Sequence, residues 1–236
     1  MITLISKTAF LTLFVCCITV VAKAQLGYNY SQYDIGFAAG FNQANTDAET
    51  KKSTPSVHFN LTFNQTPYTN FVFEAQLGRL AGGDSLKATN GLQFNNDFSA
   101  FIFRGQLQAG EFIDYSNNRI YNAIKNVYAS AGVGYVINRI TSVSRNTSKI
   151  GNYIGGDNSS QEFFIPVRIG YEFKLFNMYN QPSVKVDLGY GYNFVLGDNL
   201  DGVIAGKHND AYSQFTIGVK FAIGNGTTSY RKQIQY

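Results

Sequence analysis

Residues 212–224 read YSQFTIGVKFAIG, and this stretch decides the fold. Its side chains alternate between two faces, of which one is wholly apolar and the other is polar or small. The apolar face holds Phe215, Ile217, Val219, Phe221 and Ile223. A period of two with one wholly apolar face is typical of a strand that has hydrocarbon on one side. The stretch therefore predicts a membrane-spanning strand of a β-barrel.

The same strand carries a second pattern, in which a polar residue, a glycine and two apolar residues stand at fixed spacing. These residues are Thr216, Gly218, Phe221 and Ile223. The pattern resembles the carboxy-terminal β-signal of bacterial outer-membrane barrels. The resemblance implies that the barrel-assembly machinery handles the chain during insertion. It also implies residence in the bacterial cell outer membrane, in contact with its lipid and lipopolysaccharide.

The amino-terminal end predicts a secretory signal peptide at 1–24. Lys7 precedes an apolar run, and Ala22-Lys23-Ala24 supplies a small-x-small cleavage site. A lipoprotein cleavage before Cys16 is the alternative, but it would cut inside the apolar run. Cleavage after Ala24 removes Cys16 and Cys17, so the mature chain is expected to have neither a disulfide nor a thiol nucleophile.

The composition favours a barrel over other classes. Tyr and Phe supply all of the 15% aromatic content, while charged residues make up only 14%. Transmembrane barrels need aromatic girdles and small interior residues, which produces such a mixture. No stretch after residue 24 approaches 18 consecutive apolar residues, which excludes a helical membrane protein. Removing two lysines with the signal peptide lowers the net charge from +4 to +2, and the scattered basic residues predict no nucleic-acid partner.

Seven further segments alternate in the same way, each about the length that a tilted membrane strand requires. With the stretch quoted first, the predicted strands are 32–41, 56–63, 70–80, 98–109, 127–140, 163–174, 183–196 and 212–224. The phase of 98–109 is the least regular, because Phe98 and Ile102 fall on its polar side. An even number of strands allows closure without an unpaired edge. We therefore predict an all-β fold, a closed antiparallel eight-stranded transmembrane barrel over 25–223.

The connections alternate in length, which predicts the orientation. Short turns are expected at the periplasmic side and long, polar loops outside the cell. The long connections are 42–54, 81–97, 141–162 and 197–211. A short periplasmic tail is expected over 224–236, without a peptidoglycan-binding domain.

One periplasmic connection, 110–126, is far longer than a turn requires. Within it, Ile120, Ala123 and Ile124 stand at helical spacing and predict two helical turns over 119–126. This segment is the predicted contact for a periplasmic protein partner.

Charged residues on the polar faces predict a cluster inside the barrel. Counting from each strand end places five of them at comparable depth: Glu74, Arg104, Arg168, Asp187 and Lys220. An eight-stranded barrel is just wide enough for side chains to fill it, and buried charges must be paired. A salt-bridged plug is the favoured interpretation, and a gated path for ions or solutes is the alternative.

No catalytic, metal or cofactor site is predicted. Catalysis by a serine or histidine needs a base within reach of a nucleophile and an orienting acid. The two histidines, His58 on a polar strand face and His208 in the last long loop, have no partner that the local sequence identifies. The aspartates of the long loops do not follow a calcium-loop spacing and are expected to be solvated loop tips.

The chain as a whole, over 32–223, resembles the small outer-membrane β-barrel superfamily. A narrower resemblance, to barrels of Bacteroidetes-type Gram-negative bacteria, is carried by YDIG at 33–36, FEAQLGRLAGGD at 73–84 and FNND at 94–97. Some of those barrels are similar to the small barrel subunit of the type IX secretion apparatus. The sequence departs from that group in its first strand, where the group's glycine-rich pattern is only partly present.

Two functional classes follow. The first is a structural or interaction protein, an anchoring or secretion-accessory barrel with a filled lumen. The second is a narrow, porin-like channel or transport protein for small solutes or ions. Because the salt-bridged plug is the favoured interpretation of the lumen charges, the first class is the prediction and the second is the alternative.

Overall fold

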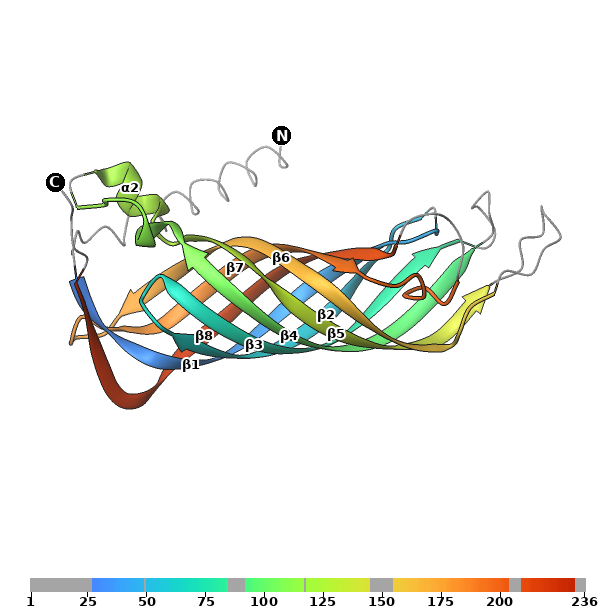
Figure 1. Cartoon of the computed structure of the whole chain (residues 1–236), viewed down its shortest axis with the longest axis horizontal. Helices are drawn as coiled ribbons and strands as arrows, with labels where there is room; N and C mark the ends of the chain where they lie inside the picture. The colour runs from blue at the N-terminus through green and yellow to red at the C-terminus, as the bar shows by residue number, and fades with distance from the viewer. Residues whose placement is uncertain are drawn as a thin grey trace, which may run out of the picture.

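The computed structural model describes residues 27–48, 50–84, 92–116, 118–144, 155–203 and 209–231. The predicted signal peptide, both cysteines and His208 lie outside these residues. The chain forms one closed barrel in which eight antiparallel strands follow each other in sequence order and β8 pairs with β1 (Figure 1). This confirms the predicted fold class.

The eight strands all overlap the predicted segments. They are β1 Gly27–Asn45, β2 Ser53–Asn64, β3 Thr69–Gly83, β4 Gln93–Gln108, β5 Val127–Ser144, β6 Ser159–Phe176, β7 Pro182–Val195 and β8 Ala211–Arg231. Because Gly27 pairs with Arg231, the start of β1 and the end of β8 lie at the same end of the cylinder. We call this the terminal end, and we call the opposite end, which carries the longer connections, the loop end.

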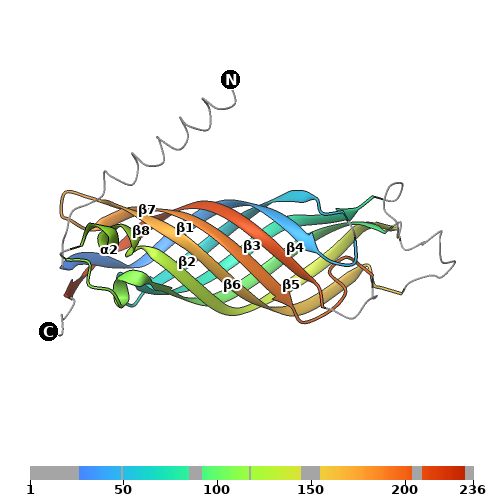
Figure 2. The same ribbon diagram turned by 90° about the horizontal axis from the view of Figure 1, so that it is seen from above.

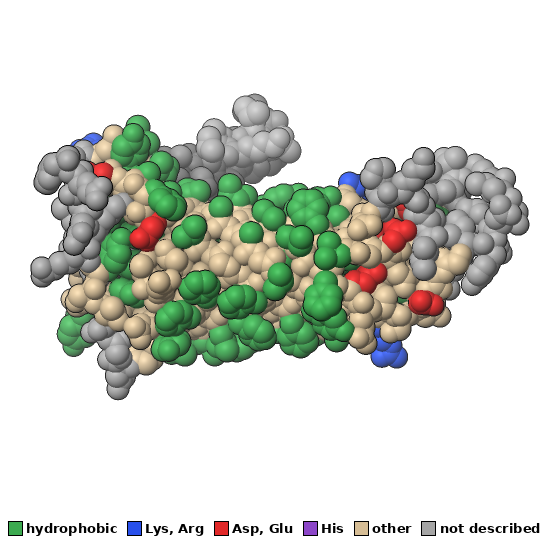
Figure 3. All heavy atoms as spheres, viewed as in Figure 1, with side chains coloured by type: hydrophobic (Ala, Val, Ile, Leu, Met, Phe, Trp, Pro, Cys, Tyr) green, Lys and Arg blue, Asp and Glu red, His purple; other side chains and the backbone are tan. Residues whose placement is uncertain are grey.

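The predicted alternation decides which side chains face outward. In β2, Val57 and Leu61 are exposed on the outer surface while His58 and Asn60 are buried in the lumen. On the face seen in Figure 3, apolar side chains spread along the middle of the cylinder and most charged ones lie toward its ends. The sheet is therefore inverted relative to a soluble barrel, with its apolar side outward and many of its polar groups inside.

The first and last strands extend beyond the predicted barrel. Residues 27–31 of β1 pair with 227–231 of β8, on the terminal side of a bulge between Ser31 and Tyr33. Gly224 lies opposite this bulge with φ 91°, in the left-handed region that favours glycine. The part of the predicted tail at 224–231 is thus strand, because backbone pairing with β1 continues past the apolar face.

The strands also reach further toward the loop end than predicted. Asp97, expected in a long loop, belongs to β4 and faces outward, where its carboxylate accepts a 2.7 Å ion pair from Arg79 of β3. The connection between β5 and β6 begins only after Ser144. Cross-strand pairing extends the sheet where the alternation of apolar residues has already ended.

The long connection at the terminal end contains two short helices, η1 (Ala109–Glu111) and α2 (Arg119–Ile124). The predicted helical turns are confirmed by α2. Its amino end is capped by Asn118, whose side-chain oxygen accepts hydrogen bonds from the backbone N–H groups of Ile120 and Tyr121. Within the described residues, no helix is long and apolar enough to span a membrane.

The four residues of the β-signal pattern lie on the part of β8 that closes the barrel against β1. Phe221 and Ile223 are exposed on the outer face, and Thr216 faces the lumen. Gly218 allows close approach to β1, because a Cβ there would lie 2.7 Å from the Cβ of Ala38. Their placement follows the alternation, while their role in assembly stays a prediction.

Candidate functional site: a filled lumen

The middle of the lumen contains a continuous network of ion pairs. Glu74 of β3 accepts a 2.6 Å contact from Arg104 of β4 and a 3.7 Å contact from Arg168 of β6. Arg168 continues to Asp187 of β7 at 3.3 Å, and Asp187 accepts from Lys220 of β8 at 2.8 Å. The structure thus brings together all five side chains of the predicted lumen cluster, from five different strands.

The network reaches the terminal end through residues that the sequence prediction did not include. Lys220 also contacts Glu172 at 2.9 Å, and Glu172 accepts a 3.1 Å hydrogen bond from Gln108. Gln108 in turn accepts from Lys174 at 2.7 Å. A second pair joins Lys185 to Asp34 at 2.6 Å. The alternation of side chains puts Glu172, Lys174, Lys185 and Asp34 on the lumen side of their strands. Register between non-adjacent strands is needed to place them in contact.

The lumen charges nearly balance. Five cations face four carboxylates: Arg104, Arg168, Lys174, Lys185 and Lys220 against Asp34, Glu74, Glu172 and Asp187. All nine side chains are buried, and each contacts a polar or oppositely charged group. Such pairing is the condition under which charges are tolerated away from water.

His58 has two polar partners that the local sequence did not identify. Its Nδ1 lies 2.8 Å from the Glu74 carboxylate, and its Nε2 lies 2.9 Å from the Ser56 hydroxyl. The short turn after β2 could have predicted the contact with Glu74. The turn sets the register that pairs Asn60 with Glu74, and this register places His58 diagonally across from Glu74. The order Ser56–His58–Glu74 is that of a catalytic triad.

The surroundings of this trio do not suit catalysis. Ser56 is only 4% exposed, and its hydroxyl also lies 3.1 Å from the side-chain oxygen of Asn42. The Glu74 carboxylate is shared with two arginines, so orienting the histidine is only one of its contacts. Gly40 and Gly78 lie close to Ser56, because a Cβ at Gly40 would be 3.0 Å from the Ser56 hydroxyl and one at Gly78 would be 2.7 Å from the Ser56 Cβ. We interpret the trio as part of the lumen filling.

An apolar layer fills the lumen between the charges and the loop end, and the sequence analysis did not predict it. Tyr212 of β8 packs against Phe98 of β4 and Phe164 of β6, with ring centroids 5.7 and 6.0 Å apart. Ile102 and Leu200 belong to the same buried cluster. The irregular phase at Phe98 and Ile102 was the signal, because both side chains point inward.

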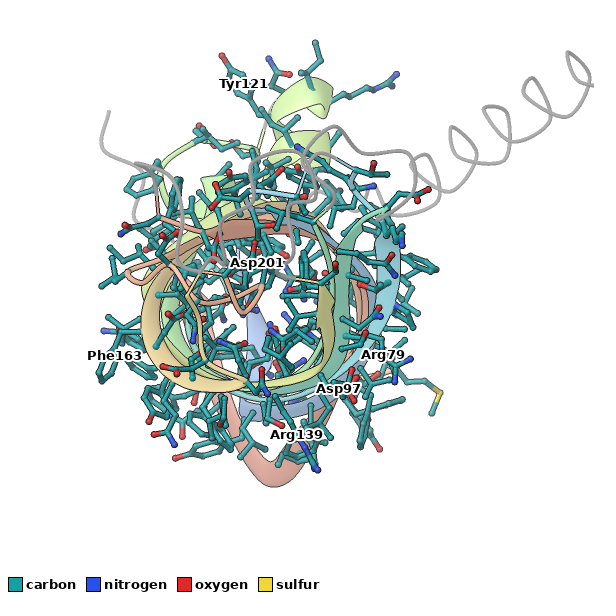
Figure 4. The ribbon with its side chains drawn as sticks, turned by 90° about the vertical axis from the view of Figure 1, so that its right-hand side faces the viewer. Arg79, Asp97, Tyr121, Arg139, Phe163 and Asp201 are labelled. Carbon is teal, nitrogen blue, oxygen red and sulfur yellow. The ribbon has the colours of Figure 1, made fainter. Side chains whose placement is uncertain are left out.

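The described part of the connection between β7 and β8 packs into the loop end of the lumen. Leu200 is buried within the apolar layer, and its carbonyl accepts a 2.8 Å hydrogen bond from Asn96 of β4. Asp201 and Asp210 are 1% and 4% exposed, so these two aspartates are not the solvated loop tips that were predicted. The Asp210 carboxylate accepts from the Leu200 backbone N–H at 2.9 Å. In Figure 4, which looks onto the loop end, Asp201 lies within the ring of strands.

Burial also changes the proton affinity of these two carboxyl groups. It raises the pKa of Asp210 to about 8, and the neighbouring Asp201 adds to this shift. Burial raises the pKa of Asp201 to about 6, against the hydrogen bond that its carboxylate accepts from the Val203 backbone. Asp47 and Asp198 add repulsion to both.

A tyrosine cluster closes the terminal end. Tyr68 packs edge-on against Tyr115 and Tyr230 at 5.7 and 5.8 Å, and Tyr30 completes the group. The Lys174 ammonium lies 4.5 Å from the centre of the Tyr68 ring. Tyr30 and Tyr230 come from the paired ends of β1 and β8, Tyr115 from the 109–116 segment, and Tyr68 from the turn between β2 and β3. The extended strand ends and the long connection thus both contribute to this cluster.

Among the described residues, no group of three or more histidine, cysteine or acidic side chains is arranged to hold a metal ion.

The lumen thus contains four layers stacked along the barrel axis. From the terminal end to the loop end these are the tyrosines, the charges, the apolar side chains and the connection between β7 and β8. Chemically, the arrangement pairs the buried charges and packs aromatic side chains on either side of them.

Neither a protein-family model nor a curated protein sequence matches the chain. Similar solved structures include Neisserial surface protein A (NspA), which is 15% identical over 82% of this chain and 98% of that chain, with a TM-score of 0.46. Ail, the attachment invasion locus protein of Yersinia pestis, is 10% identical over 81% and 98%, with a TM-score of 0.45. The outer membrane protein AlkL, solved by solid-state NMR in DMPC bilayers, is 13% identical over 91% and 97%, with a TM-score of 0.44. The barrel assignment itself rests on the strand pairing of this chain.

Proposed function

We propose that the protein is an integral outer-membrane barrel with a side-chain-filled lumen, acting as a structural or interaction protein that anchors in the membrane. The observation that carries this proposal is the unbroken chain of ion pairs from Glu74 to Glu172, which crosses the lumen. The predicted β-signal on β8 supports insertion by the barrel-assembly machinery.

The outer surface supports the membrane location. All eight strands carry exposed apolar side chains on their outward faces, among them Phe37, Leu77, Val133 and Phe163. Exposed patches of this extent on a soluble protein would promote association, whereas hydrocarbon solvates them. The closed sheet leaves no unpaired backbone edge in lipid.

The stacked layers support filling rather than conduction. A solute would have to pass the tyrosines, the paired charges, the aromatic layer and the loop-end connection in turn. An eight-stranded barrel is only wide enough for side chains to occupy its interior. Displacing any of these layers would expose buried charges that are now paired.

Planar-bilayer recording of the refolded protein tests the proposal. We expect no unit conductance steps, while a porin reconstituted in the same bilayers gives them. Steady steps that change when Arg104 or Glu74 is neutralised would show that ions pass through the charge layer, and the filled-lumen role would then be wrong.

The finer role of a secretion-accessory barrel rests on the resemblance of 33–36, 73–84 and 94–97 to Bacteroidetes-type barrels. Deleting the gene and quantifying secreted proteins in the medium tests it. A loss of secreted proteins that returns on complementation supports this role, and an unchanged set of secreted proteins leaves only anchoring.

A narrow channel is the second candidate, and one observation favours it. Asn60, Thr62 and Gln106 have buried side-chain polar atoms without a hydrogen-bond partner among the described residues. Buried polar groups of this kind are ordinarily satisfied by water. A file of such groups would suit passage of water or small ions, and the same bilayer recording decides between the two candidates.

A further inference from the structure

The short helix α2 lies outside the barrel wall and not beneath the lumen. Tyr171 of β6 belongs to the outward-facing row of that strand, and its hydroxyl donates a 2.8 Å hydrogen bond to the Ala123 carbonyl. The helix is therefore tied to the outer face of the sheet. Viewed along the barrel axis, α2 and its Tyr121 side chain project beyond the ring of strands (Figure 4), and Figures 1 and 2 place α2 at the terminal end.

The exposed side of this helix is apolar. Ile120, Tyr121 and Ile124 are 69%, 45% and 40% exposed, and they share one face because they stand three and four residues apart. Asn122 is half-buried while these three apolar side chains are exposed. This is the opposite of a helix that packs its apolar face on a protein in water. Phe112, in the segment that leads to the helix, is 73% exposed.

The depth of the helix is fixed by the strand that holds it. Beyond Tyr171, the outward face of β6 stays apolar through Phe173 and Leu175, toward the terminal end. Four residues of a strand tilted by roughly 40° correspond to about 10 Å along the barrel axis. The attachment point of α2 is thus within the apolar band and not below it. Its exposed face continues the surface that contacts hydrocarbon.

We propose that α2 is an interfacial helix whose Ile120, Tyr121 and Ile124 insert between phospholipids of the inner leaflet. This inference rests on the proposed membrane location of the barrel. Tyrosines with an apolar ring and a polar tip concentrate at the membrane interface, and Arg119, exposed at the start of the helix, is placed to contact a lipid phosphate. The occupant of this surface is therefore lipid, and not the periplasmic protein that the sequence predicts for 110–126.

The chain contains no tryptophan, which allows a direct depth measurement. Three single-tryptophan variants are refolded into vesicles: Tyr121→Trp on the helix, Phe37→Trp on the outward face of β1, and Ser229→Trp on the exposed end of β8. Lipids brominated along the acyl chain quench tryptophan that contacts lipid, and acrylamide quenches it in water. Heat-modifiable migration in gels verifies that each variant is folded.

We expect the tryptophan at 121 to be quenched by the brominated lipid at least half as strongly as that at 37. We also expect acrylamide to quench it much less than the tryptophan at 229. Acrylamide quenching equal to that at 229, with quenching of position 37 by the brominated lipid retained, would overturn the interfacial helix and leave the membrane location intact. Loss of brominated-lipid quenching at both 37 and 121 would overturn the membrane location as well.

A crosslinking experiment in cells separates lipid from protein as the occupant. A photoreactive amino acid at position 121 is expected to give phospholipid adducts. A single protein adduct of defined mass in place of the lipid adducts would show that a periplasmic partner covers the helix, and the proposal would then be wrong.

Discussion

Glu74 is the residue on which the lumen network converges. Its carboxylate contacts Arg104, Arg168 and His58. Replacing it leaves the buried Arg104 guanidinium without the carboxylate it contacts, while Arg168 keeps Asp187. We expect Glu74→Gln to lower the free energy of unfolding by about 3–5 kcal/mol, the typical cost of removing one partner of a buried pair. Urea unfolding in detergent micelles measures this change.

Arg79→Gln is the matched control, because it breaks the Arg79–Asp97 pair, whose side chains are 59% and 43% exposed. Exposed pairs contribute less than about 1 kcal/mol. An equally small effect of both substitutions would mean that the lumen is hydrated and the charge network does not hold the barrel.

The Ser56–His58–Glu74 trio makes a second prediction at the residue scale. Because the Ser56 hydroxyl is buried and packed, we expect no labelling of the folded protein by a fluorophosphonate probe that modifies activated serines. A known serine hydrolase in the same detergent is the positive control. Labelling that disappears in Ser56→Ala but persists in a Ser229→Ala control would reveal an accessible, activated nucleophile and restore an enzymatic interpretation.

At the scale of single elements, the connection between β7 and β8 is expected to respond to pH. Asp201 and Asp210 have pKa values of about 6 and 8, both raised from 3.8, and Asp47 and Asp198 add negative charge beside them. The folded state therefore binds more protons than the unfolded state between about pH 4 and 8. Their contribution to stability is greatest at the acidic end of this window and is lost as the pH rises through 8.

Hydrogen exchange at the amide of Leu200, which donates to the Asp210 carboxylate, measures this response after correction for intrinsic exchange rates. We expect protection to fall between pH 6 and 9 in the native protein. In Asp210→Asn the fall should be much reduced, because the amide oxygen still accepts this hydrogen bond and carries no charge. Asp157→Asn, at an exposed aspartate in a neighbouring connection, should retain the full fall; a flat profile in the native protein would contradict the prediction.

The elements also show what a sequence can and cannot predict for this fold. Existence and phase of the strands follow from local alternation, as at 212–224, because each residue faces either hydrocarbon or lumen. The ends of the strands cannot be predicted in this way. The pairing of 27–31 with 227–231 is made by backbone hydrogen bonds, and no alternation of apolar residues marks it in the sequence. The position of α2 outside the wall involves a contact, from Tyr171 to Ala123, between segments 48 residues apart, which the local sequence does not reveal.

The candidate site, too, could be predicted from the sequence only in part. Depth along each strand can be counted, which brings Glu74, Arg104, Arg168, Asp187 and Lys220 to one level. Which of them touch depends on curvature and on register across non-adjacent strands. The apolar layer contradicts the rule that lumen faces are polar, because Phe98, Phe164 and Tyr212 are buried against one another and not against lipid.

For the whole molecule, the stacked layers imply that no single layer controls closure. The charge layer and the apolar layer each span the lumen, so weakening one leaves the other in place. We expect neither the neutral pair Glu74→Gln with Arg104→Gln nor the truncations Phe98→Ala with Phe164→Ala to give conductance steps in planar bilayers. The four substitutions together should produce frequent, brief openings, because water can then enter both the charge layer and the apolar layer.

The control is a pair of outward-facing substitutions of equal size, Phe101→Ala with Phe163→Ala. We expect no conductance steps from this pair, either alone or combined with the neutral pair. Steps from the neutral pair alone would show that the charges are the only barrier, and the layered closure would be wrong.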